Sequence, residues 1–373
     1  MWRESAMKRI GILGGGQLGR MMALSAREMG FEILTLDPTD NAPCAQVADQ
    51  HIQAAFTDVE AAKQLAAESD VVTYEFENIS TEVAEAIGTK LIHGTDLLFQ
   101  TQHRVREKEM IERIGHSVAP YYPVTHPSDL EEAKQRLGLP FVLKTARFGY
   151  DGKGQTVIRT EEQFQAAIKQ FEPTEYVAEQ WLPFDQEISV IVTRSATETR
   201  VFPVSENIHR ENILHLSIVP ARISESLEQE AIALAESIAD AVGLIGTLAI
   251  ELFVVGSRLI VNELAPRPHN SGHYSIDACE TSQFEQHIRA ISGLPLGDTR
   301  LTTPVVMANI LGQHVTALYE ELPRLNARTK VHLYGKAEAK TGRKMGHLNI
   351  LADTVDDALA EVERLSIWKE TVQ

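Results

Sequence analysis

The sequence has few cysteines, no long apolar run and little positive charge. Cys44 and Cys279 are its only cysteines among 373 residues, and they are far apart. This excludes a disulfide framework or a cysteine-rich zinc site and favours a reducing cytoplasm. No apolar run approaches the ~20 residues that span a bilayer, so we expect no membrane partner. The first residues lack the order of a signal peptide, and Met7 is an alternative start.

Acidic residues outnumber basic ones, with 52 Asp and Glu against 35 Lys and Arg, and the formal charge is −17. A nucleic-acid-binding face is basic, so we expect no nucleic acid partner. An anionic small substrate is compatible with this charge if Lys and Arg gather at its site. Hydrophobic content is 43% and charged content 23%, which are ordinary values for a globular protein of roughly two or three domains.

Short strands and helices alternate in the first hundred residues, which predicts a parallel α/β sheet. The predicted strands are residues 8–13, 31–36, 70–74 and 90–93. A small α+β unit follows, then a unit of longer strands, then a tail. The expected units are residues 1–100, 101–182, 183–300 and 301–373.

A glycine turn at residues 14–19 matches G-x-G-x-x-G between a strand and a helix, and Asp37 follows. This pattern is typical of dinucleotide binding, which would mean NAD or FAD. Two other interpretations remain open: the turn needs glycines for its geometry, or the helix N-terminus holds another phosphate or polar ligand. The rest of the chain favours the last.

A second glycine-rich segment, 144–155, has the sequence KTARFGYDGKGQ and lies between two predicted strands. Gly154 rather than Ser or Thr follows Lys153, and a strand rather than a helix is predicted next, so the segment is not a Walker loop. Its glycines nevertheless let backbone N–H groups face a polyphosphate. Lys144 would reach the α- and β-phosphates, and Lys153 lies on the loop. The alternative is an exposed hairpin with solvated lysines. Downstream, the strand end at 176–182 could contact adenine, and Glu187 could accept ribose hydroxyls.

Two acids, Glu251 and Glu263, end predicted strands on either side of a short turn. Hairpin pairing would bring the carboxylates together, and Mg²⁺ with nucleotide phosphates would balance their charge. The alternative is two unrelated acids on an exposed hairpin. Arg267, His269 and Asn270 follow directly and offer donors for a small planar anion such as bicarbonate.

The tail contains basic residues flanked by glycines, in YGK at 334–336 and GRKMGH at 342–347. A phosphomonoester is a suitable ligand for them, and a solvated charge run is the alternative.

In this order, the motifs GILGGGQLGRM, YEFEN, GYDGKGQ, NELAPRPHNSGH and LYGK…GRKMGH resemble those of the ATP-grasp superfamily, and within it the N5-carboxyaminoimidazole ribonucleotide synthases. The resemblance extends from residue 8 to 347. Ala265 departs from the Asn that many ATP-grasp enzymes have at a third metal position, and the APRPHNSGH form resembles this family's own variant.

The resemblance implies an α/β ATP-grasp architecture with a Rossmann-like pre-ATP-grasp domain, a small α+β lid, a larger α+β domain and a C-terminal module packed on it. It also implies a homodimer and the carboxylation of 5-aminoimidazole ribonucleotide with ATP and bicarbonate, which yields ADP and phosphate.

The same resemblance implies a role for individual residues. The implied ATP contacts are Arg104, Lys144, Gly149, Tyr150, Asp151, Gly152, Lys153, Gly154, Gln155, Glu179, Gln180, Trp181, Leu182, Glu187, His209, Asn262 and Glu263. Glu251 and Glu263 would hold Mg²⁺. The residues implied for bicarbonate or carboxyphosphate are Arg267, His269, Asn270 and Lys336. The residues implied around the ribonucleotide are Gln17, Leu18, Glu75, Tyr150, Asp151, Lys336 and Arg343.

Four other functions remain as alternatives. Two lie within the superfamily, a formate-using glycinamide ribonucleotide transformylase and a biotin carboxylase, although the latter would be longer. From the first glycines alone, the chain could be an NAD-dependent oxidoreductase. It could also be a nucleotide-binding module without turnover.

Overall fold

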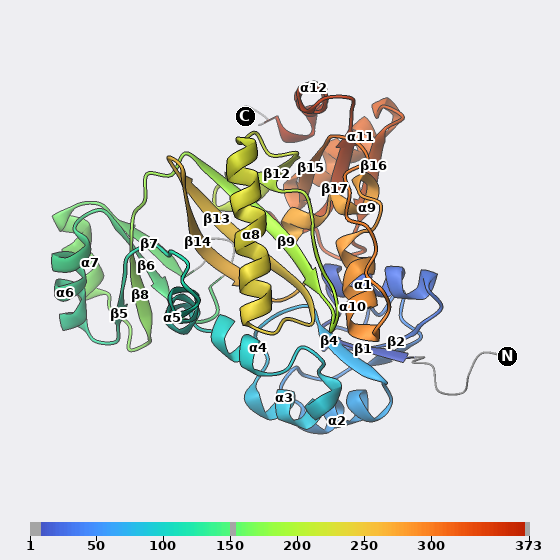
Figure 1. Cartoon of the computed structure of the whole chain (residues 1–373), viewed down its shortest axis with the longest axis horizontal. Helices are drawn as coiled ribbons and strands as arrows, with labels where there is room; N and C mark the ends of the chain where they lie inside the picture. Colours follow the sequence, from blue (N-terminus) through green and yellow to red (C-terminus); the bar gives the residue numbers. More distant parts are fainter. Residues whose placement is uncertain (1–8, 150–153, 370–373) are drawn as a thin grey trace.

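The computed structural model describes residues 9–149 and 154–369, and its strands form three sheets (Figure 1). The first sheet is parallel, with the strand order β3-β2-β1-β4. This unit contains β1 (Arg9–Leu13), α1 (Gln17–Glu28), β2 (Glu32–Leu36), β3 (Gln50–Ile52), α2 (Val59–Ala67), β4 (Val71–Tyr74), α3 (Thr81–Ile87), η1 (Gly88–Lys90) and α4 (Asp96–Thr101).

One strand predicted for this sheet is wrong. Residues 90–93 include the end of η1 and one isolated bridge from Leu91 to Val72, and the fourth strand is β3. The β3 sequence, Gln-His-Ile, has one apolar residue and no alternation, so its pattern does not distinguish it from a loop. Pairing with β2 is what makes it a strand.

The second sheet is antiparallel, with the order β5-β8-β6-β7, and forms the green unit at one side of Figure 1. Phe141 and Phe164 are both fully buried and anchor its own small core. Helix α5 (Arg104–Ile114) precedes this unit. The unit contains β5 (Tyr121–Val124), α6 (Pro127–Leu137), β6 (Phe141–Thr145), β7 (Gln155–Ile158), α7 (Glu161–Lys169) and β8 (Tyr176–Gln180).

The third sheet has nine strands, in the order β14-β13-β9-β11-β12-β15-β17-β16, with β10 beside β9. Its first part contains β9 (Gln186–Arg194), β10 (Thr199–Val201), β11 (Ser205–Arg210), β12 (Ile213–Val219), α8 (Glu225–Ala241), β13 (Gly246–Val255), β14 (Arg258–Ala265), η2 (Asn270–Gly272), α9 (Ser275–Ala278) and α10 (Gln283–Ser292). The tail adds β15 (Val305–Leu311), η3 (Gly312–His314), α11 (Val315–Glu321), η4 (Leu322–Arg324), β16 (Thr329–Leu333), β17 (Lys344–Leu351), α12 (Val355–Arg364) and η5 (Ser366–Trp368). Because β15 pairs with β12, the tail extends this sheet.

The alternating residues of strand β9 show that the two faces of the large sheet differ. Ile188, Val190 and Val192 are fully buried in one core with α8, which crosses the sheet in Figure 1. Alternate residues in a strand point to opposite faces, so Ser189 and Ile191 lie on the face turned away from α8. That second face carries the polar residues described below.

Helix α10 joins the large sheet to the first unit. Its residues Phe284, Ile288 and Ile291 share a core with Ile10 and Ile12 of β1. Because α10 also packs on β13 and β9, it holds the parallel sheet against the large sheet.

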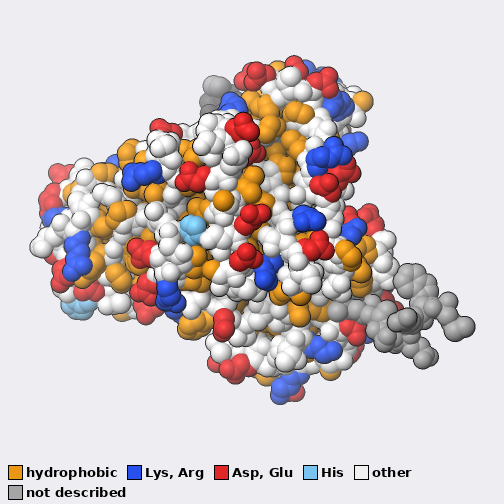
Figure 2. Space-filling model, in the orientation of Figure 1, with side chains coloured by type: hydrophobic (Ala, Val, Ile, Leu, Met, Phe, Trp, Pro, Cys, Tyr) orange, Lys and Arg blue, Asp and Glu red, His pale blue; other side chains and the backbone are white. Residues whose placement is uncertain are grey.

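Acidic and basic side chains are interspersed on the face drawn in Figure 2 and do not form one basic area there. Within 9–149 and 154–369, none of the helices combines the length and apolarity that a membrane crossing requires.

Candidate active site

Carboxylates project from neighbouring strands on the face turned away from α8. Glu251 of β13 lies opposite Glu263 of β14 on one side and Ser189 of β9 on the other. Because Glu187 is two residues before Ser189, it lies on this face too. The structure thus brings Glu251 and Glu263 together, as the hairpin predicts.

This acid pair has the properties of a cation site. Burial, together with the charge of Glu263, raises the pKa of Glu251 to about 8. Asn262 has no cross-strand partner, because Glu251 pairs with Glu263 and Leu252 with Val261, which makes it a bulge residue. Its Oδ1 atom is buried without a hydrogen-bond partner among the described residues. Two acids and an unpaired oxygen fit a divalent cation.

No group of three or more His, Cys, Asp or Glu side chains suited to a metal is present within the described residues. A cation here would therefore need nucleotide phosphates and water as further ligands, which is how Mg²⁺ is usually held.

We expect Mg²⁺ binding at this pair to depend on pH. The pKa of Glu251 is raised in the folded chain from an ordinary value of 4.5 to about 8, so its proton stabilises the fold at low pH and this contribution is lost as pH rises to 8. Mg²⁺ must displace that proton, so its affinity should be about tenfold weaker at pH 7 than above pH 8. Thermal midpoints with ADP and titrated Mg²⁺ measure this. An equal Mg²⁺ affinity at pH 6.5 and 9 would contradict it, and Glu251→Gln should remove the dependence.

Lys144 and Lys108 share one carboxylate, that of Glu179 in β8. Lys144 Nζ donates to Glu179 Oε2 at 2.9 Å, and Lys108 Nζ lies 3.3 Å from Oε1. Burial opposes the charge of Glu179, but Lys108 and Lys144 outweigh it and hold its pKa at about 2. Lys108 is 1% exposed. Lys108 would still neutralise Glu179 if Lys144 turned toward a ligand.

Lys108→Met is expected to lower the free energy of unfolding by about 3 kcal/mol, because it leaves a buried carboxylate with one partner fewer. Urea unfolding measures this. The double variant Lys108→Met/Glu179→Gln should recover much of the loss, because the unbalanced charge is then absent. Equal stability of Lys108→Met and the parent protein would show that Lys144 suffices.

At the strand end predicted to contact adenine, two backbone N–H groups already have hydrogen-bond partners in the protein. The N–H groups of Gln180 and Trp181 donate to the carbonyls of Pro120 at 2.8 Å and Pro140 at 3.2 Å. Leu182, directly after them, is half-buried and lies just beyond the strand.

Glu187, the predicted ribose contact, forms an ion pair with His209 of β11. Burial disfavours the charge of His209, but Glu187 raises its pKa above the ordinary value. The two predicted nucleotide residues are therefore brought together.

The glycine loop is described only at its ends. Tyr150, Asp151, Gly152 and Lys153 lie outside the described residues. Gly149 is the last described residue before them. Gly154 has φ +74°, and an added Cβ would lie 2.5 Å from Thr145 Oγ1. Gln155 pairs with Lys144 across β6 and β7, so the loop starts beside the lysine it is predicted to assist.

The turn after β14 places its basic residues beside the acids. Arg267 Nε lies 2.8 Å from Glu77 Oε1. His269 Nδ1 accepts from Ser271 N at 3.3 Å, so the imidazole proton is on Nε2, which lies 3.5 Å from Glu251 Oε1. Burial, together with the charge of Arg267, lowers the pKa of His269 well below its ordinary value, so this histidine is neutral.

Unlike Arg267 and His269, which lie beside carboxylates, Asn270 is paired with another amide side chain. Its amide donates to Asn309 Oδ1 at 3.1 Å and accepts from Asn309 Nδ2 at 2.7 Å. An amide nitrogen has two hydrogens, so one is left for the anion role predicted for Asn270.

A second group of predicted residues meets at the start of α1. Glu75 accepts hydrogen bonds from Gly16 N and, at 2.8 Å, from Gly19 N. Lys336 Nζ donates to Gln17 Oε1 at 2.7 Å. The glycine-turn amides that a dinucleotide phosphate would need are therefore bonded to a carboxylate, which disfavours NAD or FAD binding.

Two other predicted residues of this group have different surroundings. The Leu18 side chain is buried in the core with α10, so only its backbone could face a ligand. Arg343 is exposed and donates to Glu338 O at 3.1 Å.

Sequence reasoning missed several charged residues of this region. Glu107 of α5 accepts from Leu264 N at 2.8 Å, on the same helix as Arg104, a predicted ATP contact whose Nη1 lies 3.2 Å from Glu263 Oε2. Lys108 lies one turn after Arg104, which is a spacing that could have revealed it. Glu77 is part of the YEFEN motif, from which only Glu75 was selected.

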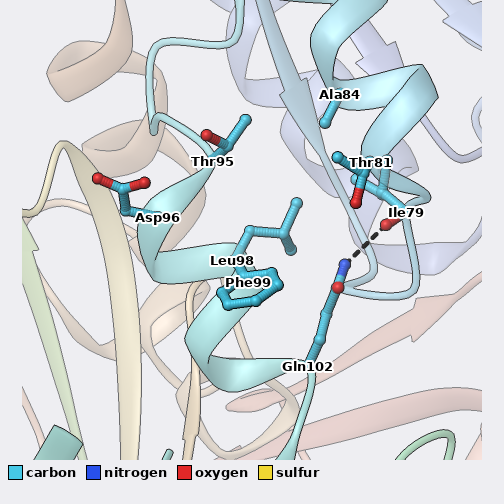
Figure 3. Close-up of a pocket in the computed structure, with 8 residues that line it drawn as sticks. All are labelled: Ile79, Thr81, Ala84, Thr95, Asp96, Leu98, Phe99 and Gln102. Carbon is cyan, nitrogen blue, oxygen red and sulfur yellow. Dashed lines mark hydrogen bonds between the residues drawn. The ribbon is translucent and has the colours of Figure 1, made fainter. Parts of the chain in front are cut away.

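A cavity of about 210 Å³ lies between α3 and α4, and none of the predicted residues lines it (Figure 3). Ile79, Leu98 and Phe99 are among its apolar lining residues, and Gln102 closes one side. Gln102 Nε2 donates to the carbonyls of Glu77 and Ile79, at 2.7 Å each. The cavity is therefore next to residues 77–79, in the segment that also carries Glu75.

Three family models match successive parts of the chain. They describe a ribonucleotide synthetase preATP-grasp domain at residues 7–94, an ATP-grasp domain at 109–284 and a phosphoribosylaminoimidazole carboxylase C-terminal domain at 305–361. The N5-carboxyaminoimidazole ribonucleotide synthase of Bacillus subtilis is 50% identical over 357 residues, covering 95% of this chain and 94% of that protein. This chain belongs to the N5-carboxyaminoimidazole ribonucleotide synthase family. The predicted ATP-grasp architecture is confirmed.

Solved structures of the N5-carboxyaminoimidazole ribonucleotide synthase family agree with this fold. An ADP complex of one synthetase is 54% identical, with a TM-score of 0.95, and covers 99% of this chain and 98% of that one. A synthase from Aspergillus clavatus, in complex with ADP and 5-aminoimidazole ribonucleotide, is 31% identical, with a TM-score of 0.90 and 98% coverage of both chains.

Proposed function

We propose that this chain is an ATP-dependent carboxylating C–N ligase that converts 5-aminoimidazole ribonucleotide, bicarbonate and ATP into N5-carboxyaminoimidazole ribonucleotide, ADP and phosphate. The supporting observation is that Arg267 interacts with acids of both groups of residues. Its charge interacts with Glu263 of the acid pair and with Glu75, which accepts from the glycine turn. A small anion held at Arg267 would face both a nucleotide and a second substrate.

The nucleotide would lie between the lid and the second face of the large sheet. Lys144 would exchange Glu179 for a phosphate, and Glu187 with His209 would hold the ribose. Glu251, Glu263 and Asn262 would hold Mg²⁺, which neutralises the phosphate oxygens when bound. The ribonucleotide would lie near Gln17, Glu75 and Lys336.

The chemistry proceeds in two stages, phosphoryl transfer to bicarbonate and then carboxylation of the amine. A bicarbonate oxygen attacks the γ-phosphorus, the bond to the β-phosphate oxygen breaks, and ADP leaves. Arg267 and Lys144 offset the charge on the transferred phosphoryl group through positioning and electrostatics. Carboxyphosphate then breaks down to CO₂ and phosphate within the site, and the exocyclic amine attacks the carbon of this CO₂. The departing phosphate accepts the amine proton. Neutral His269 can donate its Nε2 hydrogen to the intermediate.

ADP release tests this function directly. We expect release that requires bicarbonate and 5-aminoimidazole ribonucleotide together, with a carboxylated product. Turnover with formate and glycinamide ribonucleotide, or a change in nicotinamide absorbance, would contradict the proposal. ATP binding without turnover would indicate a binding module.

A homodimer and a cytoplasmic location, both expected from the sequence, are part of this proposal. Light scattering of the purified chain tests the first, and cell fractionation tests the second.

A further inference from the structure

Two acids with different partners follow β4 in one short segment. Glu75 accepts from the amides of α1, where the ribonucleotide is proposed to bind, and Glu77 forms an ion pair with Arg267, where bicarbonate is proposed to bind. Only Phe76 separates the two acids along the chain, so one short segment reaches both sites. A shift of the 75–79 segment would therefore move residues at both the ribonucleotide site and the bicarbonate site.

Glu77 is the ion-pair partner that orients Arg267. Both side chains are about one-fifth exposed, at 19% and 20%, so water screens their attraction little. Burial disfavours the charge of Arg267, but Glu77 raises its pKa above the ordinary value, and Glu263 and Glu75 add to this. Arg267 Nη1 donates to Pro268 O at 3.1 Å. With Nε at Glu77 and Nη1 at Pro268, the Nη2 group is the part of the fork left to face an anion.

The backbone of Glu77 is itself fixed. Gln102 Nε2 donates to the carbonyls of Glu77 and Ile79, and Figure 3 draws the bond to Ile79. Gln102 is two residues before Arg104, which pairs with Glu263. The same stretch of chain thus holds the segment behind Arg267 and one acid of the cation site.

We infer that Glu77 is a positioning residue for Arg267, and that the 75–79 segment couples the ribonucleotide site to the bicarbonate site. This inference rests on the proposed function. When the ribonucleotide contacts Glu75, the segment holds Glu77 in place and Glu77 aims Arg267. When no ribonucleotide contacts Glu75, the Arg267 guanidinium is misplaced and phosphoryl transfer to bicarbonate is slow.

The experiment compares Glu77→Gln, Glu77→Asp and Gln102→Leu with the parent protein. Glu77→Gln should lower kcat about 10²-fold, because misplacement by ~1 Å has that effect. The KM for ATP should stay within about twofold, because Glu77 lies away from the nucleotide residues. The ratio of ADP release with ribonucleotide to release without it should fall toward one. Glu77→Asp should recover part of kcat, and Gln102→Leu, which keeps the charge, should lower the same ratio.

Glu85→Gln serves as the matched control, because Glu85 is an exposed acid on the neighbouring helix α3. It should leave kcat and the ratio unchanged. The inference is overturned if Glu77→Gln keeps kcat within threefold, or if kcat and the KM for ATP change together in proportion to lost thermal stability. If Glu77→Gln does not fold, unchanged ratios in Glu77→Asp and Gln102→Leu overturn it equally. Absence of ribonucleotide-dependent ADP release in the parent protein would instead reject the proposed function.

Discussion

Arg267→Ala is expected to lower kcat by about 10²–10³-fold, which is the effect of removing one preorganised donor from a developing anion. Arg267 is largely buried and forms an ion pair with Glu77, which raises its pKa above the ordinary value. Nucleotide affinity should change less than about twofold, because the nucleotide residues are on other strands. Steady-state kinetics and ADP titration measure the two effects. Near-normal turnover would remove Arg267 from the anion role.

Loss of Arg267 also leaves Glu77 as an unpaired acid in a largely buried position, which costs about 3 kcal/mol of unfolding free energy. The double variant Arg267→Ala/Glu77→Gln should recover that stability but not the turnover. Arg200→Ala is the matched control, since Arg200 is an exposed arginine on β10. If the double variant regained activity, the defect of Arg267→Ala would be one of folding.

Glu263→Gln is expected to lower kcat by about 10³-fold, which corresponds to several kcal/mol of lost charge stabilisation. Glu263 lies opposite Glu251 and pairs with Arg104 at 3.2 Å. The amide keeps the shape but not the charge that attracts Mg²⁺. Turnover measured against Mg²⁺ concentration should show a higher requirement for the metal.

Two comparisons separate this metal role from a structural one. Glu263→Asp keeps a carboxylate and should recover part of the rate at high Mg²⁺. Glu320→Gln, at an exposed acid of α11, should behave as the parent protein. An unchanged Mg²⁺ requirement in Glu263→Gln would place the cation elsewhere.

The sequence by itself determined the features that depend on short stretches of chain. The hairpin around Gly256 brought Glu251 and Glu263 near each other, because a tight turn limits the register of antiparallel strands. The bulge at Asn262, which the sequence did not predict, places them directly opposite each other. The alternation of strands and helices determined the parallel sheet, and the order of the motifs determined the family. Where the local pattern was weak, as in β3, the prediction was wrong.

Tertiary structure alone decided which distant residues are partners. Glu77 meets Arg267 and Lys108 meets Glu179 because α10 and α5 pack separate units against one sheet. The packing of α10 also turned the Leu18 side chain into the core, and the pairing of β15 with β12 brought Asn309 to the Asn270 amide. A one-dimensional pattern shows which residues are charged or apolar. It does not show which charges share a buried space, because that depends on how the apolar faces dock.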